Sequence, residues 1–357
     1  MPKRMSAENL QRFCIEALGK TGLKPENPAT VADVLVMTDT WGTFSHETGA
    51  LRNYLISLRA EGMDPDGKAE LVSEGDSWAV VDGGSGMGMP ACCLAMITAI
   101  DKARTNTIAW AGVRNSNHFG AARYYADLAA CHDMIGIVMS NADPNMVAPG
   151  GKGNLIGNNL LANAVPAGEE HPILLDIALR AVAAGKILAM KSLGQPIPPT
   201  WLTDAERLPV AEVGEWLATG AMGAMVPIAG HNGYGIALLI ETLAALLPGA
   251  EVLNDAKNWI ANPSAKGRLG QDIIVINPAA ILPIGDFKRR INEMIRKIHD
   301  SPKAMDSARI WLPGEIEWER REDALVNEID LPKSVLTSLY GAAQDIGLDT
   351  RLLNRNA

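Results

Sequence analysis

Histidine is scarce in this chain, and one histidine stands where a side chain can do acid–base chemistry. The six are His46, His118, His132, His171, His231 and His299. His46 follows Ser45 in a connector between two predicted helices, and such a connector can aim a side chain into a cleft. A general acid needs that access together with a hydrogen-bonding neighbour that fixes the imidazole tautomer. The spacing alone also fits an ordinary surface histidine.

A second histidine, His118, stands near the predicted start of a helix. It lies in N-S-N-H-F-G at 115–120, after a predicted strand at 107–115. The N-terminal end of a helix carries partial positive charge and unpaired N–H groups, so it can receive a phosphate or keep an imidazole neutral. His118 is therefore either a helix-capping residue or a site residue.

A loop rich in Gly, Pro and Asn follows the next predicted strand, at 141–159. Its backbone N–H groups and side-chain amides point in fixed directions, which suits a polar, anionic ligand that the chain approaches closely. We interpret that ligand as a nicotinamide cofactor. Two residues further along stay open: Asp176 is either structural or an acceptor for a ribose or an imidazolium, and Lys186 is either solvated or a cation for a carboxylate or phosphate.

Other kinds of chemistry find little support in the sequence. Adjacent residues such as Ser45 and His46 rarely align for nucleophilic attack, and no G-x-S-x-G elbow occurs, so a hydrolase is disfavoured. The four cysteines form no C-x-x-C pair, and no H-E-x-x-H appears, so the sequence predicts no metal site. The cysteines are typical of reduced thiols in a cytoplasmic protein.

The bulk composition narrows the possible partners. A net charge of −9 and a pI of about 5.3 argue against nucleic acid and against an anionic membrane surface. The longest apolar stretch, at 236–250, is interrupted by Glu241 and is too short to span a bilayer. A small-molecule ligand held by local donors is the remaining expectation.

A glycine cluster after the predicted strand at 78–83 resembles a dinucleotide fingerprint only in part. Gly84, Gly86 and Gly88 give G-x-G-x-G, but Met89 stands where the fingerprint continues with small residues, and the next strand lacks an acidic end. We interpret the cluster as a tight turn, not as a phosphate loop.

Helical patterns dominate both ends of the chain, and strand patterns dominate the middle. The sequence predicts helices at 7–19, 27–42, 51–62 and 181–194, strands between 77 and 178, a strand with a turn at 308–315 and a closing helix at 331–348. This order indicates an α+β fold without a Rossmann unit, in which residues 1–75 with 286–357 form a helical domain and residues 76–285 form an inserted mixed-sheet domain.

Several motifs together carry a resemblance. They are S-H at 45–46, L-x-x-Y-L at 51–55, N-S-N-H-F-G at 115–120, D-P-N-M-V-A-P-G-G at 143–151, G-N-N-L-L-A at 157–162, L-D-I-A at 175–178, G-K-I at 185–187, G-H-N-G-Y-G at 230–235 and L-P-G-E at 312–315. In order and spacing the chain resembles the malate/L-lactate dehydrogenase family, whose cofactor site is not of the Rossmann type.

The resemblance implies a homodimer that uses NAD or NADP, in which the helical domain carries the substrate and dimer contacts and the inserted domain binds the cofactor. It implies reversible hydride transfer between the cofactor and a small 2-hydroxy acid or its 2-oxo or cyclic-imine counterpart. His46 would be the proton donor, with Ser45 orienting it, and His118 is the alternative acid/base. The cofactor-binding residues it implies are His118, Phe119, Gly120, Ala121, Ala122, Asp176, Ile177, Ala178, His231, Asn232, Pro313, Gly314 and Glu315. The substrate-binding residues it implies are Arg52, Asn158 and Lys186.

The chain departs from the family pattern at positions near the expected substrate. Glu47 replaces a glycine after the S-H pair, Ala50 replaces an arginine, Asn232 replaces a lysine, and Leu160 replaces a proline. Arg52 is a possible substitute for the missing guanidinium, although it points in another direction along a helix. Three interpretations remain open: a 2-hydroxy acid dehydrogenase of altered specificity, a cyclic-imine reductase, and a paralogue that binds nucleotide without turnover.

Overall fold

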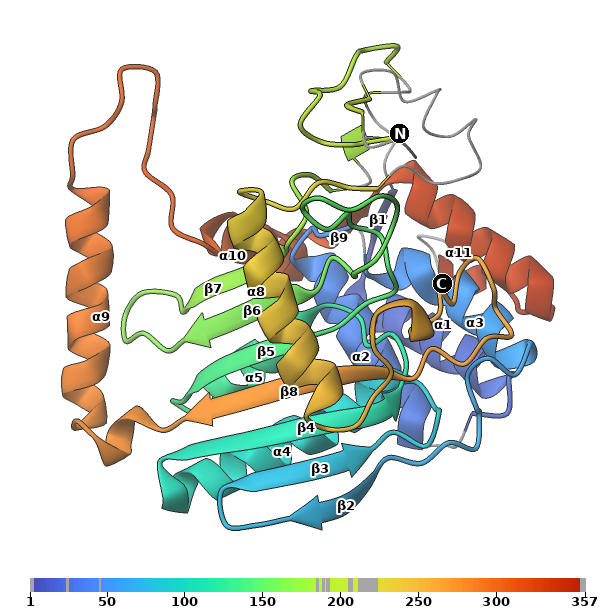
Figure 1. The fold of residues 1–357 in the computed structure, drawn as a ribbon, viewed down its shortest axis with the longest axis horizontal. Helices are drawn as coiled ribbons and strands as arrows, with labels where there is room; N and C mark the ends of the chain where they lie inside the picture. The colour runs from blue at the N-terminus through green and yellow to red at the C-terminus, as the bar shows by residue number, and fades with distance from the viewer. Residues whose placement is uncertain are drawn as a thin grey trace.

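A mixed β-sheet forms the centre of the molecule (Figure 1). The computed structural model describes residues 3–23, 26–44, 46–183, 186–187, 190, 193–204, 208–210 and 224–353. Across these residues seven strands lie in the order β2-β3-β4-β8-β5-β6-β7. The strands are β2 (Glu70–Glu74), β3 (Trp78–Asp82), β4 (Ile108–Ser116), β5 (Ile135–Ser140), β6 (Leu160–Val165), β7 (Ile173–Ala178) and β8 (Leu269–Ile276). Only β3 and β4 run parallel, so this is a mixed α+β sheet and not the doubly wound parallel sheet of a Rossmann fold.

Helices cover both faces of the sheet (Figure 1). Helices α4 (Gly88–Asn106) and α5 (Ala122–Ala130) pack on one face, and α8 (His231–Glu241) with the π-helical turn η2 (Thr242–Leu246) packs on the other. Alternate residues of β3 and β4, such as Ala79, Val81, Ala111 and Val113, are buried because successive side chains of a strand point to opposite faces. A smaller apolar core lies under α8 and includes Ile240.

Elements from the two ends of the chain lie together beside the sheet. Strand β1 (Lys3–Met5) pairs antiparallel with β9 (Ile329–Leu331). The helices of this region are α1 (Ala7–Gly19), α2 (Glu26–Thr40), α3 (Leu51–Arg59), α10 (Glu315–Asn327) and α11 (Lys333–Ile346). The apolar stripe predicted for residues 7–19 is confirmed, since Leu10, Phe13 and Cys14 are fully buried. The division into two domains stays a prediction.

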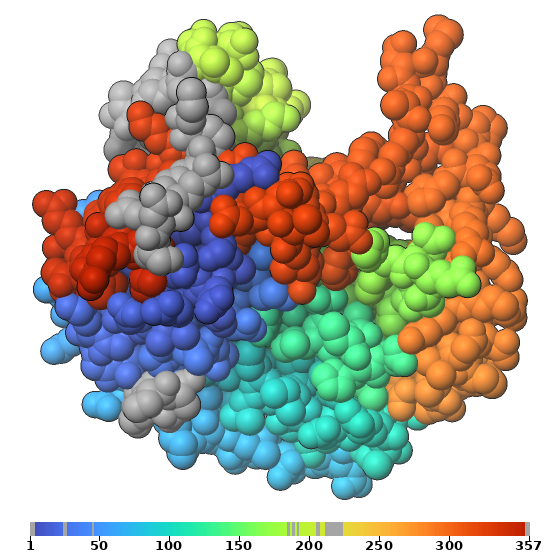
Figure 2. Space-filling view, turned by 180° about the vertical axis from the view of Figure 1, so that it is seen from behind, coloured from blue at the N-terminus to red at the C-terminus, as the bar shows by residue number. Residues whose placement is uncertain are grey.

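Helix α9 (Ile284–His299) stands apart from the terminal helices, beyond the edge strand β7 (Figure 1). From behind, residues 284–311 form an arm along one side of the molecule (Figure 2). The arm is tied to the β6–β7 loop, where Asn292 accepts the backbone N–H of Gly168 at 3.0 Å. Short 3₁₀ segments complete the described elements: η1 (Thr48–Ala50), η3 (Leu253–Asp255), η4 (Pro278–Ala280) and η5 (Arg351–Leu353).

The glycine cluster between β3 and α4 is a closely packed turn. The backbone N–H of Ser85 donates to the Asn115 carbonyl at 2.8 Å, and a Cβ on Gly88 would lie 2.3 Å from the Asn117 carbonyl oxygen. The chain at 115–119 thus occupies the space in front of α4, as the interpretation of a tight turn requires.

Two sequence expectations meet other outcomes. The strand predicted within 308–315 is wrong: residues 308–312 pair with no strand, and Leu312 donates its backbone N–H to Glu315 at the start of α10. The helix expected at 181–194 lies largely outside the described residues.

Among the helices that are described, none combines the length and apolar character required to cross a bilayer. Cys14, Cys92, Cys93 and Cys131 are all free thiols.

Candidate active site

Two stacked histidine rings lie in the lining of a cavity of about 580 Å³. His46 lies in the connector ahead of η1, and His118 follows β4. The ring centroids are 5.2 Å apart, and the planes differ by 5°. Residues more than 70 positions apart in the chain are therefore brought into one stack, and both line the cavity.

The surroundings of His118 fix its tautomer. The Tyr54 hydroxyl pairs with Nδ1, and the backbone N–H of Gly120 points to the same atom at 3.4 Å. Because a backbone N–H can only donate, Nδ1 is the acceptor and Nε2 carries the hydrogen. Trp259 packs beside both rings, at 4.8 Å from Tyr54 and 5.1 Å from His118. Burial, with a smaller contribution from His46, lowers the pKa of His118 to about 3, so this imidazole is neutral.

His46 is also held in its neutral form, but the charges around it shift its pKa in opposite directions. Burial lowers its pKa, Asp176 opposes that shift, and the positive charges of Arg180 and Arg123 lower the pKa further. A neutral imidazole can accept a proton, and a nearby carboxylate stabilises the imidazolium that results. The site can therefore support a reversible proton transfer at His46.

A buried arginine fixes the carboxylate of Asp176. Arg123, in the first turn of α5, donates its backbone N–H and its Nε to Asp176 Oδ2 at 3.3 and 3.1 Å. Its Nη1 lies 3.5 Å from Glu317 on α10, and the Arg123 side chain is only 7% exposed. Trp41 packs against the guanidinium at 5.8 Å. This ion-pair network joins β7, α5 and the C-terminal region at the edge of the site.

One wall of the cavity is built from amides and a second arginine. Asn145 donates to Asn158 at 2.7 Å, and both line the cavity with Arg180. Asp143 accepts from Asn258 at 2.9 Å, and burial raises the pKa of its carboxyl group. The wall offers hydrogen-bond donors to a polar, anionic ligand.

The residues expected at the cofactor after His118 are close to the cavity. Phe119 lines it and stacks on Tyr125 at 5.2 Å, and Gly120 turns the chain with a φ of +79°. Ala121 and Ala122 are buried where α5 begins. On β7, Ile177 points away from Asp176 and packs against the core under α8, while Ala178 is half-buried.

The structure places the other expected residues away from this cavity. Arg52 pairs with Asp345 of α11 at 2.8 Å on the surface, so it does not replace the missing guanidinium. Lys186 is exposed and lies over the Trp201 ring at 5.3 Å. His231 and Asn232 are exposed at the start of α8. Ser45 lies outside the described residues.

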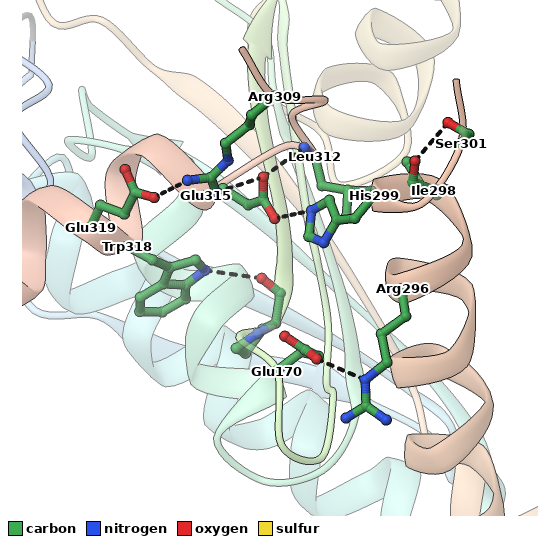
Figure 3. A network of polar contacts seen from close by, with 11 residues as sticks. Glu170, Arg296, Ile298, His299, Ser301, Arg309, Leu312, Glu315, Trp318 and Glu319 are labelled. Atoms are coloured by element: carbon green, nitrogen blue, oxygen red, sulfur yellow. Dashed lines mark hydrogen bonds and ion pairs between the residues drawn. The ribbon is translucent and has the colours of Figure 1, made fainter. Parts of the chain in front are cut away.

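Pro313 and Glu315, on either side of Gly314, border a second, smaller cavity of about 180 Å³. Glu315 lies between His299 at 2.6 Å and Arg309 at 3.1 Å (Figure 3). Burial acts to raise the pKa of Glu315, but the Leu312 N–H and these two side chains together bring it below its usual value. The carboxylate of Glu315 is thus ionised and held in place by hydrogen bonds at the start of α10.

Four residues of the cavity region were not predicted as site residues: Tyr54, which appeared only as part of the L-x-x-Y-L motif, and Arg123, Arg180 and Trp259. A weak signal existed for two of them, because Arg123 interrupts a run of alanines and Arg180 follows L-D-I-A almost directly. No pattern distinguishes Trp259, which reaches His118 from a loop more than 130 residues away. In the part of the chain that the structure describes, no group of three or more His, Cys, Asp or Glu side chains could hold a metal ion.

Comparison with known proteins now defines the class. Residues 5–340 match the profile of the malate/L-lactate dehydrogenase family. The chain is 34% identical over 351 residues to the malate dehydrogenase of Pyrococcus abyssi, covering 97% of this chain and 95% of that one. It is 34% identical over 345 residues to the L-sulfolactate dehydrogenase of Methanocaldococcus jannaschii, covering 97% and 98%.

A solved structure agrees with the sequence matches. The sulfolactate dehydrogenase from Methanocaldococcus jannaschii superposes with a TM-score of 0.89 at 33% identity, covering 97% of this chain and 98% of the other. The protein is therefore an oxidoreductase of the dehydrogenase type. It belongs to the malate/L-lactate dehydrogenase family.

Proposed function

We propose that this protein is an NAD- or NADP-dependent dehydrogenase that interconverts a small 2-hydroxy acid and its 2-oxo acid. One observation carries the proposal: two neutral imidazoles are stacked at 5.2 Å in the lining of a cavity, and the half-buried carboxylate of Asp176 raises the pKa of one of them, His46. The names of the relatives, which include malate and L-sulfolactate dehydrogenases, support an acidic hydroxy substrate.

The residues around the cavity fit a nicotinamide cofactor. A volume of about 580 Å³ lies within the range of small-molecule sites, which is roughly 300–1,000 Å³. Among the described residues that line it, the side-chain oxygen Oδ1 of Asn145 is buried without a hydrogen-bond partner. Such an acceptor suits the amide N–H groups of a nicotinamide. The run from His118 to Ala122 and the turn at 313–315 would hold the cofactor.

A bound nicotinamide supplies the hydride acceptor for oxidation and the hydride donor for reduction. His46 handles the proton. During oxidation the neutral imidazole removes the proton of the substrate hydroxyl while the hydride leaves C2. During reduction the imidazolium returns that proton to the oxygen as the hydride arrives. Asp176 stabilises the imidazolium, and positioned acid–base catalysis of this type contributes roughly 10²–10⁴-fold.

His118 has a different role from His46. Its Nδ1 accepts from Tyr54 and Gly120, so its remaining polar atom is the Nε2–H donor. A pKa of about 3 keeps it from acting as a base near neutral pH. We assign His118 to donating a hydrogen bond toward the substrate oxygen, while Trp259 excludes water from that side.

We also propose a homodimer. Several large apolar side chains on α8 and the segment after it are exposed, among them Ile236, Leu239, Leu246 and Leu247 at 44%, 55%, 60% and 57%. Large exposed apolar side chains gathered within one short segment, at 236–247, are typical of a subunit interface.

The test of the function measures NADH and NADPH oxidation with oxaloacetate, pyruvate, sulfopyruvate and a cyclic imine. We expect turnover with at least one 2-oxo acid, and we expect His46→Ala to retain NAD(P)H binding while kcat falls about 10²–10⁴-fold. His132→Ala is the matched control, because His132 is exposed and bonds to the Leu128 carbonyl far from the cavity. A His46→Ala enzyme that keeps the wild-type rate would contradict the assignment. Cofactor binding without turnover across the panel would favour a non-catalytic paralogue.

A further inference from the structure

Arg180 is the one arginine or lysine among the described residues that line the cavity. It lies two residues after the end of β7, and its neighbours are held on both sides: Leu179 donates its N–H to the Asn158 carbonyl, and Ala181 donates its N–H to the Val226 carbonyl, each at 2.8 Å. The backbone is thus anchored, and the side chain shares the cavity with both histidines.

The guanidinium of Arg180 has weak partners for a partly buried charge. Its Nη1 reaches the sulfur of Met225 at 3.5 Å, and its Nε is buried without a partner among the described residues. No carboxylate in the described part of the chain forms an ion pair with it. The charge of Asp143 raises the pKa of Arg180, but the Asp143 carboxylate accepts its hydrogen bond from Asn258 instead. A buried cation without a contacting anion is costly, and a planar guanidinium binds carboxylates in a bidentate manner.

The neighbouring groups favour an anion at this position. Asn158 adds a side-chain amide donor to the same wall, whereas the amide of Asn145 already donates to the Asp143 carbonyl and to Asn158. The two acidic residues of the lining are Glu47 and Asp143, and burial favours the neutral form of each. Ala50 also lines the cavity but offers no side-chain donor, and Arg52 is engaged with Asp345 outside it. The positive charge available to a ligand in this cavity therefore comes from Arg180.

We infer that Arg180 binds the carboxylate of the substrate and thereby selects 2-oxo and 2-hydroxy acids over neutral carbonyl compounds and alcohols. This inference rests on the proposed function, because it assigns the substrate end of that same cavity. The guanidinium fork takes the two carboxylate oxygens, and the oxygen on C2 then faces the imidazoles.

The arrangement also couples substrate binding to His46. The charge of Arg180 lowers the pKa of His46. A carboxylate bound to Arg180 offsets that charge, so the pKa of His46 rises when the acid is bound. Removing the guanidinium should therefore shift the acidic limb of the pH profile of the free enzyme, an effect that a purely structural role would not produce.

The experiment compares wild type with Arg180→Met and Arg180→Lys. Oxamate, an unreactive carboxylate, is titrated by calorimetry into each protein saturated with NADH, and KM and kcat are measured for the best 2-oxo acid. We expect Arg180→Met to weaken oxamate binding and raise KM on the order of 100-fold, with unchanged NADH affinity. Arg180→Lys should recover part of the loss, because it keeps the charge without the fork. Arg104→Met, on the exposed surface of α4, is the matched control.

The possible outcomes separate the two proposals. Equal oxamate affinity and KM in wild type and in a folded Arg180→Met protein would overturn the assignment of Arg180 and leave the dehydrogenase function intact. Should Arg180→Met fail to fold, equal values for Arg180→Lys and wild type would overturn it in the same way. Oxamate binding that depends on Arg180 in a protein without turnover would support the carboxylate site and refute the dehydrogenase function. Absence of oxamate binding to wild type would refute the carboxylate site.

Discussion

Replacing Glu47 with glutamine should remove a pH-dependent destabilisation of the fold. Glu47 is 4% exposed, and its Oε2 is buried without a partner among the described residues. Burial raises its pKa from 4.5 to about 7, although backbone N–H groups from residue 47 itself, His46 and Gly49 oppose the shift. The folded protein therefore holds a proton that the unfolded chain has already released between pH 4.5 and 7.

The sign and size of the effect follow from this difference. An acid whose pKa is raised in the folded state loses stability as the pH rises through the window from 4.5 to about 7, and the full cost is present above it. A shift of roughly 2.5 units at 1.36 kcal/mol each gives about 3 kcal/mol. Glutamine keeps an oxygen that accepts from the backbone N–H groups but cannot ionise. We expect Glu47→Gln to be about 3 kcal/mol more stable than wild type above pH 7, relative to their difference near pH 4.5.

The assay is urea unfolding of wild type and Glu47→Gln at several pH values across that window. The difference between the two proteins is the relevant quantity, since groups that do not interact with the charge of Glu47 contribute equally to both and cancel. Asp39, whose pKa the charge of Glu47 raises, changes the difference in the same direction. Glu16→Gln, at an exposed position of α1, is the control and should show no such trend. A difference between wild type and Glu47→Gln that is constant with pH would refute the reasoning.

Two other predictions concern His118 and the proposed subunit interface. The pKa of His118 in the folded protein is about 3, below its usual 6.5, so its contribution to stability is present above pH 6.5 and is lost as the pH falls from there toward 3. In the same unfolding assay His118→Gln should therefore lose less stability than wild type on acidification, by about 2 kcal/mol at pH 5. Equal losses in the two proteins would contradict the assigned neutral state of His118. Leu239→Asp, on the exposed face of α8, should convert the homodimer to monomers in sedimentation equilibrium, whereas Leu325→Asp on α10 should not; two unchanged dimers would place the interface elsewhere.

The sequence determined most of the local structure and part of the site. The apolar stripe of α1 and the alternation along β3 and β4 follow from side-chain periodicity, which is a local property of the chain. The motifs pointed to His46 and His118, and the irregular glycine spacing excluded a phosphate loop. These inferences depend on neighbouring residues alone, so the sequence was sufficient for them.

Tertiary structure decided the features that join distant parts of the chain. Strand β8 lies between β4 and β5, although more than 120 residues separate it from β5 along the chain, because strand pairing depends on which edges meet in space. The same holds in the site: Arg52 is drawn to Asp345 on α11, Arg180 reaches the cavity from the end of β7, and Trp259 closes over His118. Which charge lies beside which imidazole is set by packing between distant segments, and no local pattern encodes it.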